Sequence, residues 1–82
     1  MKNLKRPFSL VQVIPNPCRN LVLVVSHEQV RRAFFIDSTG KTVLCQEVPN
    51  GRIRVDALSA GTYTVNIEHN NSVITTLELV KE

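Results

Sequence analysis

The residues best suited to catalysis in this 82-residue chain occur singly rather than in groups. Ser26-His27-Glu28 contains the residue types of a nucleophilic triad, but adjacent side chains in an extended segment point in opposite directions. We therefore interpret this stretch as a polar loop tip between two strands. Asp37, Glu47 and Asp56 could pair as acid and base, yet nothing in the sequence fixes their separation. The sequence predicts no catalytic site, and we expect the protein not to be an enzyme.

Metal and cofactor binding are not indicated either. Cys18 and Cys45 lie far apart without a Cys-x-x-Cys motif, and His27 and His69 lack the spacing of zinc ligands. The three glycines do not form a glycine-rich phosphate loop. We expect two small, buried or half-buried cysteines, and a disulfide between them is the alternative in an oxidising compartment. No metal and no cofactor is expected.

The net charge of +3 is concentrated at the start of the chain. Lys2, Lys5 and Arg6 lie in an acid-free segment, whereas basic and acidic side chains balance from residue 9 onward. The concentrated basic surface of a nucleic-acid-binding protein is therefore missing. No run approaches the ~20 apolar residues of a transmembrane segment, and the start lacks the continuous apolar segment of a signal peptide. We expect a piece of a longer exported protein rather than a cytosolic chain.

The elements that carry these residues alternate between apolar and polar side chains with period two. This pattern is typical of strands, and a chain of this length forms one domain that buries roughly 60% of its unfolded surface. Short strands separated by frequent turns favour a sandwich or a small barrel, so the fold class is all-β. The predicted strands cover residues 10–14, 20–25, 32–37, 42–48, 52–55, 62–68 and 72–80. In the last three strands, the predicted inward faces carry Ile53 and Val55, then Tyr63, Val65 and Ile67, then Val73, Leu77 and Leu79.

The turns between these strands have specific residue types. Pro15-Asn16-Pro17 lacks two ladder donors, so it must end or redirect a strand. Asp37-Ser38-Thr39-Gly40 has the ends of a type I turn, and Gly40 can take a positive φ. Asn50-Gly51 predicts a hairpin, and Asn70-Asn71 is a weaker version of the same signal. Ser59-Ala60-Gly61 interrupts the chain once more.

Two predicted strands carry apolar side chains on both faces. Either both faces are covered, for instance by residues 2–8 or by a loop, or the domain exposes an apolar patch for a partner. The residues that could form this patch are Val22, Val24, Phe34 and Ile36.

Four elements, taken in order, resemble the C-terminal sorting domain (type A) of proteins exported by the type IX secretion system of Gram-negative bacteria. The resemblance covers about residues 10–82. Ile14-Pro15-Asn16-Pro17 is similar to the family's opening Tyr-Pro-Asn-Pro element, and Ile36-Asp37-Ser38-Thr39-Gly40-Lys41 is similar to its Tyr-Asp-x-x-Gly-Lys hairpin. Residues 58–65 match Leu-x-x-Gly-x-Tyr-x-Val, and the end of the chain resembles Lys-x-Val-Lys. The chain departs from the family where Ile14 and Ile36 replace Tyr and where Glu78 replaces Lys.

This resemblance implies a seven-stranded, two-sheet immunoglobulin-like sandwich over residues 10–82, behind a linker or an artificially added segment at residues 1–9. It implies a non-catalytic signal that directs an N-terminal cargo domain from the periplasm to the cell surface or the medium. Its partners would be an outer-membrane shuttle, a translocon and a sortase that removes the domain or attaches the cargo. The recognition residues would be Leu79, Val80 and Lys81, and Lys81 at the extreme end would offer a mobile charge able to reach a carboxylate. The motif residues are Pro15, Asn16, Pro17, Asp37, Gly40, Lys41, Leu58, Gly61 and Tyr63.

The sequence leaves two alternative functions open. One is an accessory domain that fixes the geometry of a neighbouring enzyme, with contacts concentrated near the N-terminus. The other is an immunoglobulin-like or fibronectin-like adhesion or scaffolding module of a secreted protein. Such a module would bind through the apolar patch and would tolerate changes in its last four residues.

Overall fold

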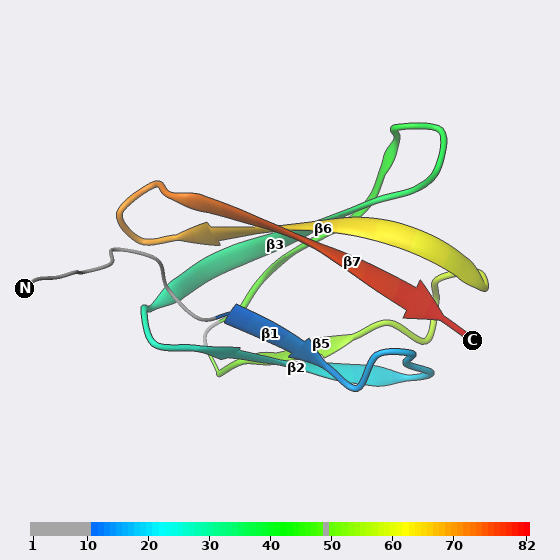
Figure 1. Cartoon of the computed structure of the whole chain (residues 1–82), viewed down its shortest axis with the longest axis horizontal. Coiled ribbons are helices and arrows are strands. Elements are labelled where there is room, and N and C mark those ends of the chain that lie inside the picture. The colour runs from blue at the N-terminus through cyan, green and yellow to red at the C-terminus, as the bar shows by residue number, and fades with distance from the viewer. Residues whose placement is uncertain (1–10, 49) are drawn as a thin grey trace, which may run out of the picture.

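The computed structural model describes residues 11–48 and 50–82, and these residues form seven strands (Figure 1). The predicted segment 1–9 lies outside the described residues. Within the described ranges, no helix is long and apolar enough to cross a membrane. The strands are β1 (Val11–Ile14), β2 (Leu21–Ser26), β3 (Val30–Ile36), β4 (Thr42–Glu47), β5 (Arg52–Arg54), β6 (Gly61–His69) and β7 (Ile74–Lys81).

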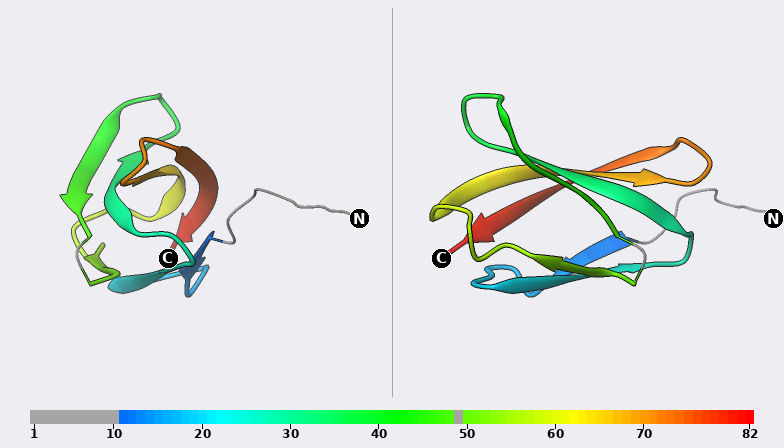
Figure 2. Two further views of the ribbon diagram at one scale, coloured as in Figure 1. Left: turned by 90° about the vertical axis from the view of Figure 1, so that its left-hand side faces the viewer. Right: turned by 180° about the vertical axis from the view of Figure 1, so that it is seen from behind.

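The strands form two antiparallel sheets that face each other (Figure 2). Sheet A has the order β1-β2-β5, and sheet B has the order β4-β3-β6-β7. The predicted all-β, two-sheet architecture is confirmed, and the immunoglobulin-like topology in particular stays an expectation. Sheet order already places the last strand, β7, at one edge of sheet B.

The core lies between the sheets because one face of each strand is apolar. Tyr63, Val65 and Ile67 of β6 point inward as predicted, and so does Ile53 of β5. The fully buried side chains, those with under 2% exposure, are Cys18, Val22, Phe35, Ile53, Val55, Val65, Ile67, His69 and Leu79. Val73, predicted on the inward face of the last strand, instead lies in the turn before β7 and is 52% exposed.

The predicted hairpin at Asn50-Gly51 is wrong. The strands on either side belong to different sheets, because β5 pairs with β2 and not with β4. The turn itself forms, and Gly51 adopts a φ of 79° while its carbonyl accepts the Val24 N–H at 2.7 Å. A Cβ at position 51 would lie 3.1 Å from the Val24 carbonyl oxygen, so glycine permits this close approach. The turn residues were identified correctly, but the pairing of the strands depends on burying Ile53 in the core.

The exposed patch that the sequence offered as one of two alternatives is on the wrong face in β2, whereas Phe34 and Ile36 do lie on the face of β3 opposite the buried Ala33 and Phe35. Val22 is fully buried, and Val24 packs against the core. Phe34 and Ile36 are half-buried, and the guanidinium of Arg32 lies 5.7 Å from the centre of the Phe34 ring. Strand β2 does carry apolar side chains on both faces, but the side chains that face outward are those of Leu21, Leu23 and Val25. The correct face could not be chosen from the sequence because β2 is apolar at nearly every position.

Candidate functional site

The last strand, β7, has one edge paired and the other edge at the boundary of sheet B. It pairs with β6 along its whole length, from Glu68 opposite Ile74 to Gly61 opposite Lys81. Its N–H and C=O groups therefore alternate between β6 and the outer edge. The outer edge is where a partner could add a strand.

The second half of this outer edge, residues 78–82, is closed by the chain itself. The Asn16 side chain donates from Nδ2 to the Glu78 carbonyl at 2.9 Å, and its Oδ1 accepts the Val80 N–H at 2.9 Å. The Cys18 N–H donates to the Val80 carbonyl at 2.8 Å, and the Glu82 N–H donates to the Cys18 carbonyl at 2.8 Å. Residues 15–18 thus form a clasp that runs parallel to the end of β7.

The sequence of the clasp explains its geometry. Pro15 and Pro17 have no N–H to donate, so the backbone cannot continue an ordinary ladder here. The Asn16 carboxamide supplies one donor and one acceptor, as a peptide group would, and it bonds on both sides of Leu79. After the prolines the backbone of Cys18 resumes pairing. The predicted redirection of the strand is confirmed, because β1 belongs to sheet A while the clasp bonds to the edge of sheet B.

The first half of the outer edge, residues 74–77, is open. By the same alternation, Ile74 and Thr76 direct their backbone groups away from β6. These groups have no backbone partner among residues 11–48 and 50–82. Ile74 is 49% exposed. Figure 1 shows β7 running from this open half to the C-terminal end.

The three residues proposed for recognition do not present their side chains equally. Leu79 is fully buried, and Val80 is 39% exposed. Lys81 is 9% exposed and donates from Nζ to the Glu82 carbonyl at 3.4 Å, so it is not the mobile terminal charge that we expected. It lies on the inward face with Leu79 because strand residues two apart share a face. Of these three side chains, only that of Val80 faces outward.

Two further contacts hold the end of the chain. Arg19 Nε lies 3.1 Å from Glu82 Oε1, in an exposed ion pair that contributes little to stability. The thiol of Cys18 is buried beside Lys81. Burial raises the pKa of the Cys18 thiol, and the Lys81 ammonium acts in the opposite direction. The two cysteines are free, with Cys18 buried and Cys45 exposed.

The motif around Gly61 lies next to the end of β7. Gly61 pairs with Lys81 and Tyr63 pairs with Leu79. The Tyr63 hydroxyl donates to the Ser59 carbonyl at 2.6 Å while its ring is buried, and Leu58 is buried beside it in the core. This hydrogen bond fixes the turn that leads into β6.

The turn at Asp37 completes the set of predicted motif residues. Asp37 Oδ1 accepts hydrogen bonds from the Thr39 hydroxyl at 2.6 Å, the Thr39 N–H at 2.9 Å and the Lys41 N–H at 3.0 Å. Gly40 has the predicted positive φ, at 89°. The Thr39 hydroxyl, followed by the Lys41 N–H, lowers the pKa of Asp37. Asp37 and residues 57–63 line one surface depression of about 420 Å³, which brings two of the sequence motifs together.

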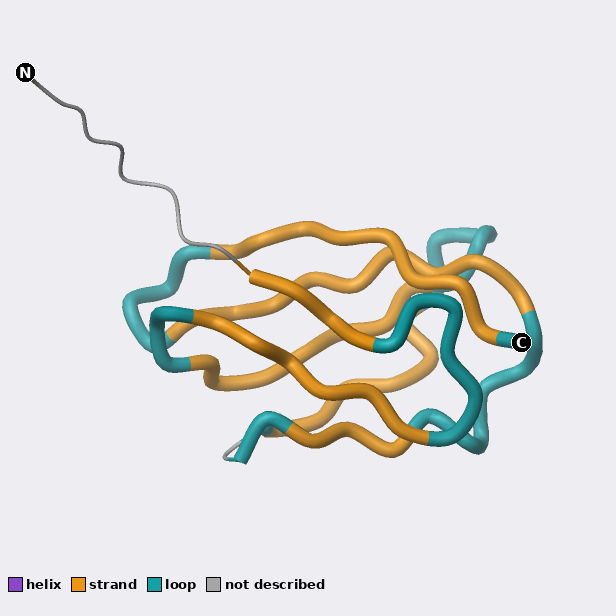
Figure 3. The backbone as a smooth tube through the Cα atoms, turned by 60° about the horizontal axis from the view of Figure 1, so that its bottom comes forward, coloured by secondary structure: helices purple, strands orange, loops and turns teal. Residues whose placement is uncertain are grey.

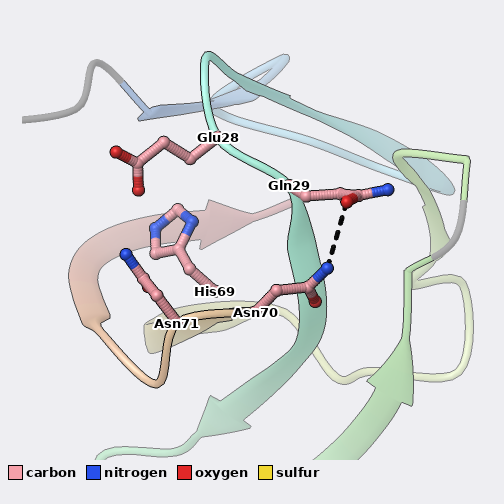
Figure 4. Close-up of a pocket in the computed structure, with 5 residues that line it drawn as sticks. All are labelled: Glu28, Gln29, His69, Asn70 and Asn71. Carbon is pink, nitrogen blue, oxygen red and sulfur yellow. Dashed lines mark hydrogen bonds between the residues drawn. The ribbon is translucent and has the colours of Figure 1, made fainter.

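A second depression, missed from the sequence, lies where the β6–β7 turn meets the β2–β3 loop (Figure 4). Its volume is about 250 Å³, and Glu28 and His69 are among its lining residues. His69 is 1% exposed; its Nε2 lies 3.0 Å from the Thr75 hydroxyl, and its Nδ1 has no protein partner in the described chain. The predicted strand ended at residue 68, and extending its alternation by one residue would have placed His69 on the inward face with Ile67. Residues 11–48 and 50–82 hold no cluster of three metal-ligating side chains.

Comparison with known proteins adds one finding. A family model described as a secretion system C-terminal sorting domain matches residues 12–82. Neither the curated proteins nor the solved structures include a significant match. The matched region begins in β1 and includes both the clasp and the end of β7.

Proposed function

The chain belongs to the family of secretion system C-terminal sorting domains, and we propose that its sorting signal is the folded surface formed by the clasp and the end of β7. Membership implies a type IX sorting signal that leads to the cell surface or to secretion. It also implies contact with the type IX machinery. The family's role is non-catalytic, and we assign the same role to this chain.

One observation carries the proposal. The Asn16 carboxamide bonds to Glu78 and Val80, which lie 62 and 64 residues further along the chain. The first and last motifs of the family are thereby joined into one surface. Gly61 and Tyr63 lie beside it through their pairing with Lys81 and Leu79. Motifs that are scattered in the sequence therefore meet at one end of the sandwich, as expected of a single recognition surface.

In the proposed pathway, an outer-membrane shuttle binds this surface and delivers the cargo that precedes the domain to the translocon. The shuttle contacts the Val80 side chain, the clasp and Glu82. Leu79 and Lys81 act by shaping the strand, since both are buried. This assignment supports Val80 as the direct contact among the three residues carried over from the family.

The test fuses the 82-residue chain behind a signal peptide and a reporter in a bacterium with a type IX system. We expect the reporter at the cell surface or in the medium, and we expect it to stay in the periplasm of a strain without the translocon. The reporter without the domain is the control. Export that is equal in both strains would contradict the proposal. The mass of the exported reporter separates sortase removal from retention of the domain.

Deletion of residues 79–82 is a poor test of recognition. It removes Leu79 from the core and removes the Glu82 N–H that bonds to Cys18. A domain that unfolds would also fail in export. Substitution of the exposed Val80 side chain separates recognition from folding.

A further inference from the structure

The outer face of sheet A carries a continuous row of exposed aliphatic side chains. Leu21, Leu23 and Val25 follow one another along β2 at alternate positions, and Ile14 extends the row onto β1. Each is between 40% and 46% exposed. Figure 3 turns this sheet toward the viewer. Exposed apolar residues are ordinary when scattered, but a contiguous set on one face indicates a binding surface.

The strand register makes the row contiguous. Leu23 lies opposite Ile14 of β1 and opposite Arg52 of β5, so it occupies the centre of the face. Leu21 lies opposite Arg54. Directly opposed side chains in an antiparallel pair lie within contact distance. The face is therefore an aliphatic row with a row of arginines along one side.

The outer face of sheet B has a different character. The outward residues of β6 are Thr62, Thr64, Asn66 and Glu68. The apolar Phe34 on this face is half-buried, and the Arg32 guanidinium that covers it is held by Glu68 at 2.7 Å. Val43, Ile74 and Val80 of sheet B are also exposed, but Thr76 and Glu78 separate Ile74 from Val80, so the described residues of sheet B form no continuous aliphatic row.

Charge identifies the partner that fits. The strands of sheet A contain two arginines and no acidic residue. Arg54 is paired with Asp56 at 3.1 Å, whereas Arg52 has no carboxylate partner within the described part of the chain. A partner with aliphatic side chains and adjacent carboxylates would complement both features.

Three other occupants fit less well. A second copy packed face to face would bring arginines toward arginines. Residues 1–10 contain Lys2, Lys5 and Arg6 and no acid, so they would also repel Arg52. A membrane surface is favoured by basic clusters and aromatic side chains, and this face offers two arginines and no aromatic residue.

We propose that the outer face of sheet A docks an acidic, amphipathic protein segment of the secretion machinery, with its aliphatic side chains on the Leu21–Leu23–Val25 row and a carboxylate on Arg52. The identity of the partner as part of that machinery rests on the proposed function. This contact is separate from the clasp and the end of β7. The domain would then be held at two surfaces during export.

The test places a photoreactive residue at position 21 of the full chain, fused to the reporter in cells that contain the type IX system. We expect a cross-link to one protein component of the machinery. Arg52→Glu should reduce its yield about tenfold, as expected for loss of a charged interface contact, while Arg52→Lys should retain it. Arg31→Glu is the matched control, since Arg31 is an exposed strand arginine of sheet B. A cross-link to lipid, to a second copy or to residues 1–10 would overturn the proposal, and so would an unchanged yield in Arg52→Glu.

Export of the same reporter separates this inference from the proposed function. Leu23→Ser should reduce export, whereas Val43→Ser, at 39% exposure against 40% for Leu23, should not. Thermal unfolding verifies that both variants fold. If Leu23→Ser does not fold, the export of Arg52→Glu is measured in its place. If Val80 variants stop export while Leu23→Ser and Arg52→Glu leave it unchanged, the docking face is wrong and the sorting surface stands. If none of these variants changes export, both are wrong.

Discussion

The two halves of the outer edge of β7 differ although they belong to one strand. In residues 74–77 the edge groups have no backbone partner among the described residues, and Ile74 is half exposed. In residues 78–82 the same groups bond to Asn16 and Cys18. Within the described part of the chain, the outer edge of β7 therefore offers strand addition to a partner at the open half and not at the closed half. At the closed half the backbone groups are already hydrogen-bonded, so a partner can contact only side chains there.

This difference bears on how a C-terminal signal could be recognised, through the backbone of a free strand or through side chains in fixed positions. A free terminal strand could be recognised through its backbone in any register. The closed half instead presents Val80 and Glu82 at positions fixed by the clasp. The prolines of the clasp and the tail are far apart in sequence, so the proposed signal would exist only in the folded domain. Recognition of such a surface would depend on correct folding of the domain as well as on its motif residues.

The largest expected difference between the halves is in stability. Leu79→Ala removes a fully buried side chain and should lower the free energy of unfolding by about 2–5 kcal/mol. Leu77→Ala removes a side chain that is only partly buried, so its effect should be clearly smaller. Chemical denaturation measures both. Equal losses would mean that the closed half is no more firmly anchored in the core than the open half.

The clasp itself should account for a smaller part of the stability. Asn16→Ala removes two exposed hydrogen bonds, so we expect a loss of about 1–2 kcal/mol in the free energy of unfolding. Amide hydrogen exchange at Val80 should become faster and approach that of Thr76. Asn16→Asp keeps the acceptor for the Val80 N–H and should protect that amide better than Asn16→Ala. Unchanged exchange at Val80 in Asn16→Ala would show that the clasp does not close the edge.

Tyr63→Phe tests the turn next to the closed half. It removes the hydrogen bond to the Ser59 carbonyl and leaves the buried ring in place. The expected loss is about 1 kcal/mol, measured by denaturation. Tyr63→Leu, which also alters the core, is the comparison and should cost more. If Tyr63→Phe is neutral, the hydroxyl bond does not hold this turn.

The smallest effect is expected at Asp37, which contacts neither half of the edge. Its folded pKa is lowered chiefly by the Thr39 hydroxyl, so its contribution to stability is present above its unfolded pKa. That contribution is lost as the pH falls through the lowered pKa of the folded state. Asp37→Asn should therefore weaken the acid dependence of the free energy of unfolding. Identical acid profiles for the two proteins would contradict this role.

Much of the fold was predictable because the alternation of apolar and polar residues along most strands matches the side chains that are buried in the core. Alternation located every strand to within a few residues, and it placed Tyr63, Val65 and Ile67 inward. The same pattern failed for β2, where both faces are apolar and only the packed sheets decide that Val22 is buried. The Asn50-Gly51 turn was predicted as a hairpin because turn residues do not reveal which sheet receives the next strand.

The candidate site was less predictable because it depends on contacts between the ends of the chain. The residues around Pro15 predicted a redirection, but nothing local showed that Asn16 would bond to the last strand. Lys81 was expected to be a mobile charge because it is next to last, yet its alternation with Leu79 turns it inward. The inward orientation of Lys81 follows from its place two residues after Leu79 on the same strand face, and its nearness to the end of the chain does not determine it.

The most direct test compares the exposed side chains of the two halves in the export assay. Val80→Gln and Ile74→Gln change side chains that are 39% and 49% exposed, so both variants should fold, and thermal unfolding verifies this. If the closed half is the sorting surface, Val80→Gln will reduce reporter export strongly while Ile74→Gln leaves it near the level of the unchanged chain. Loss of export in Ile74→Gln alone, or full export in folded Val80→Gln, would contradict that claim.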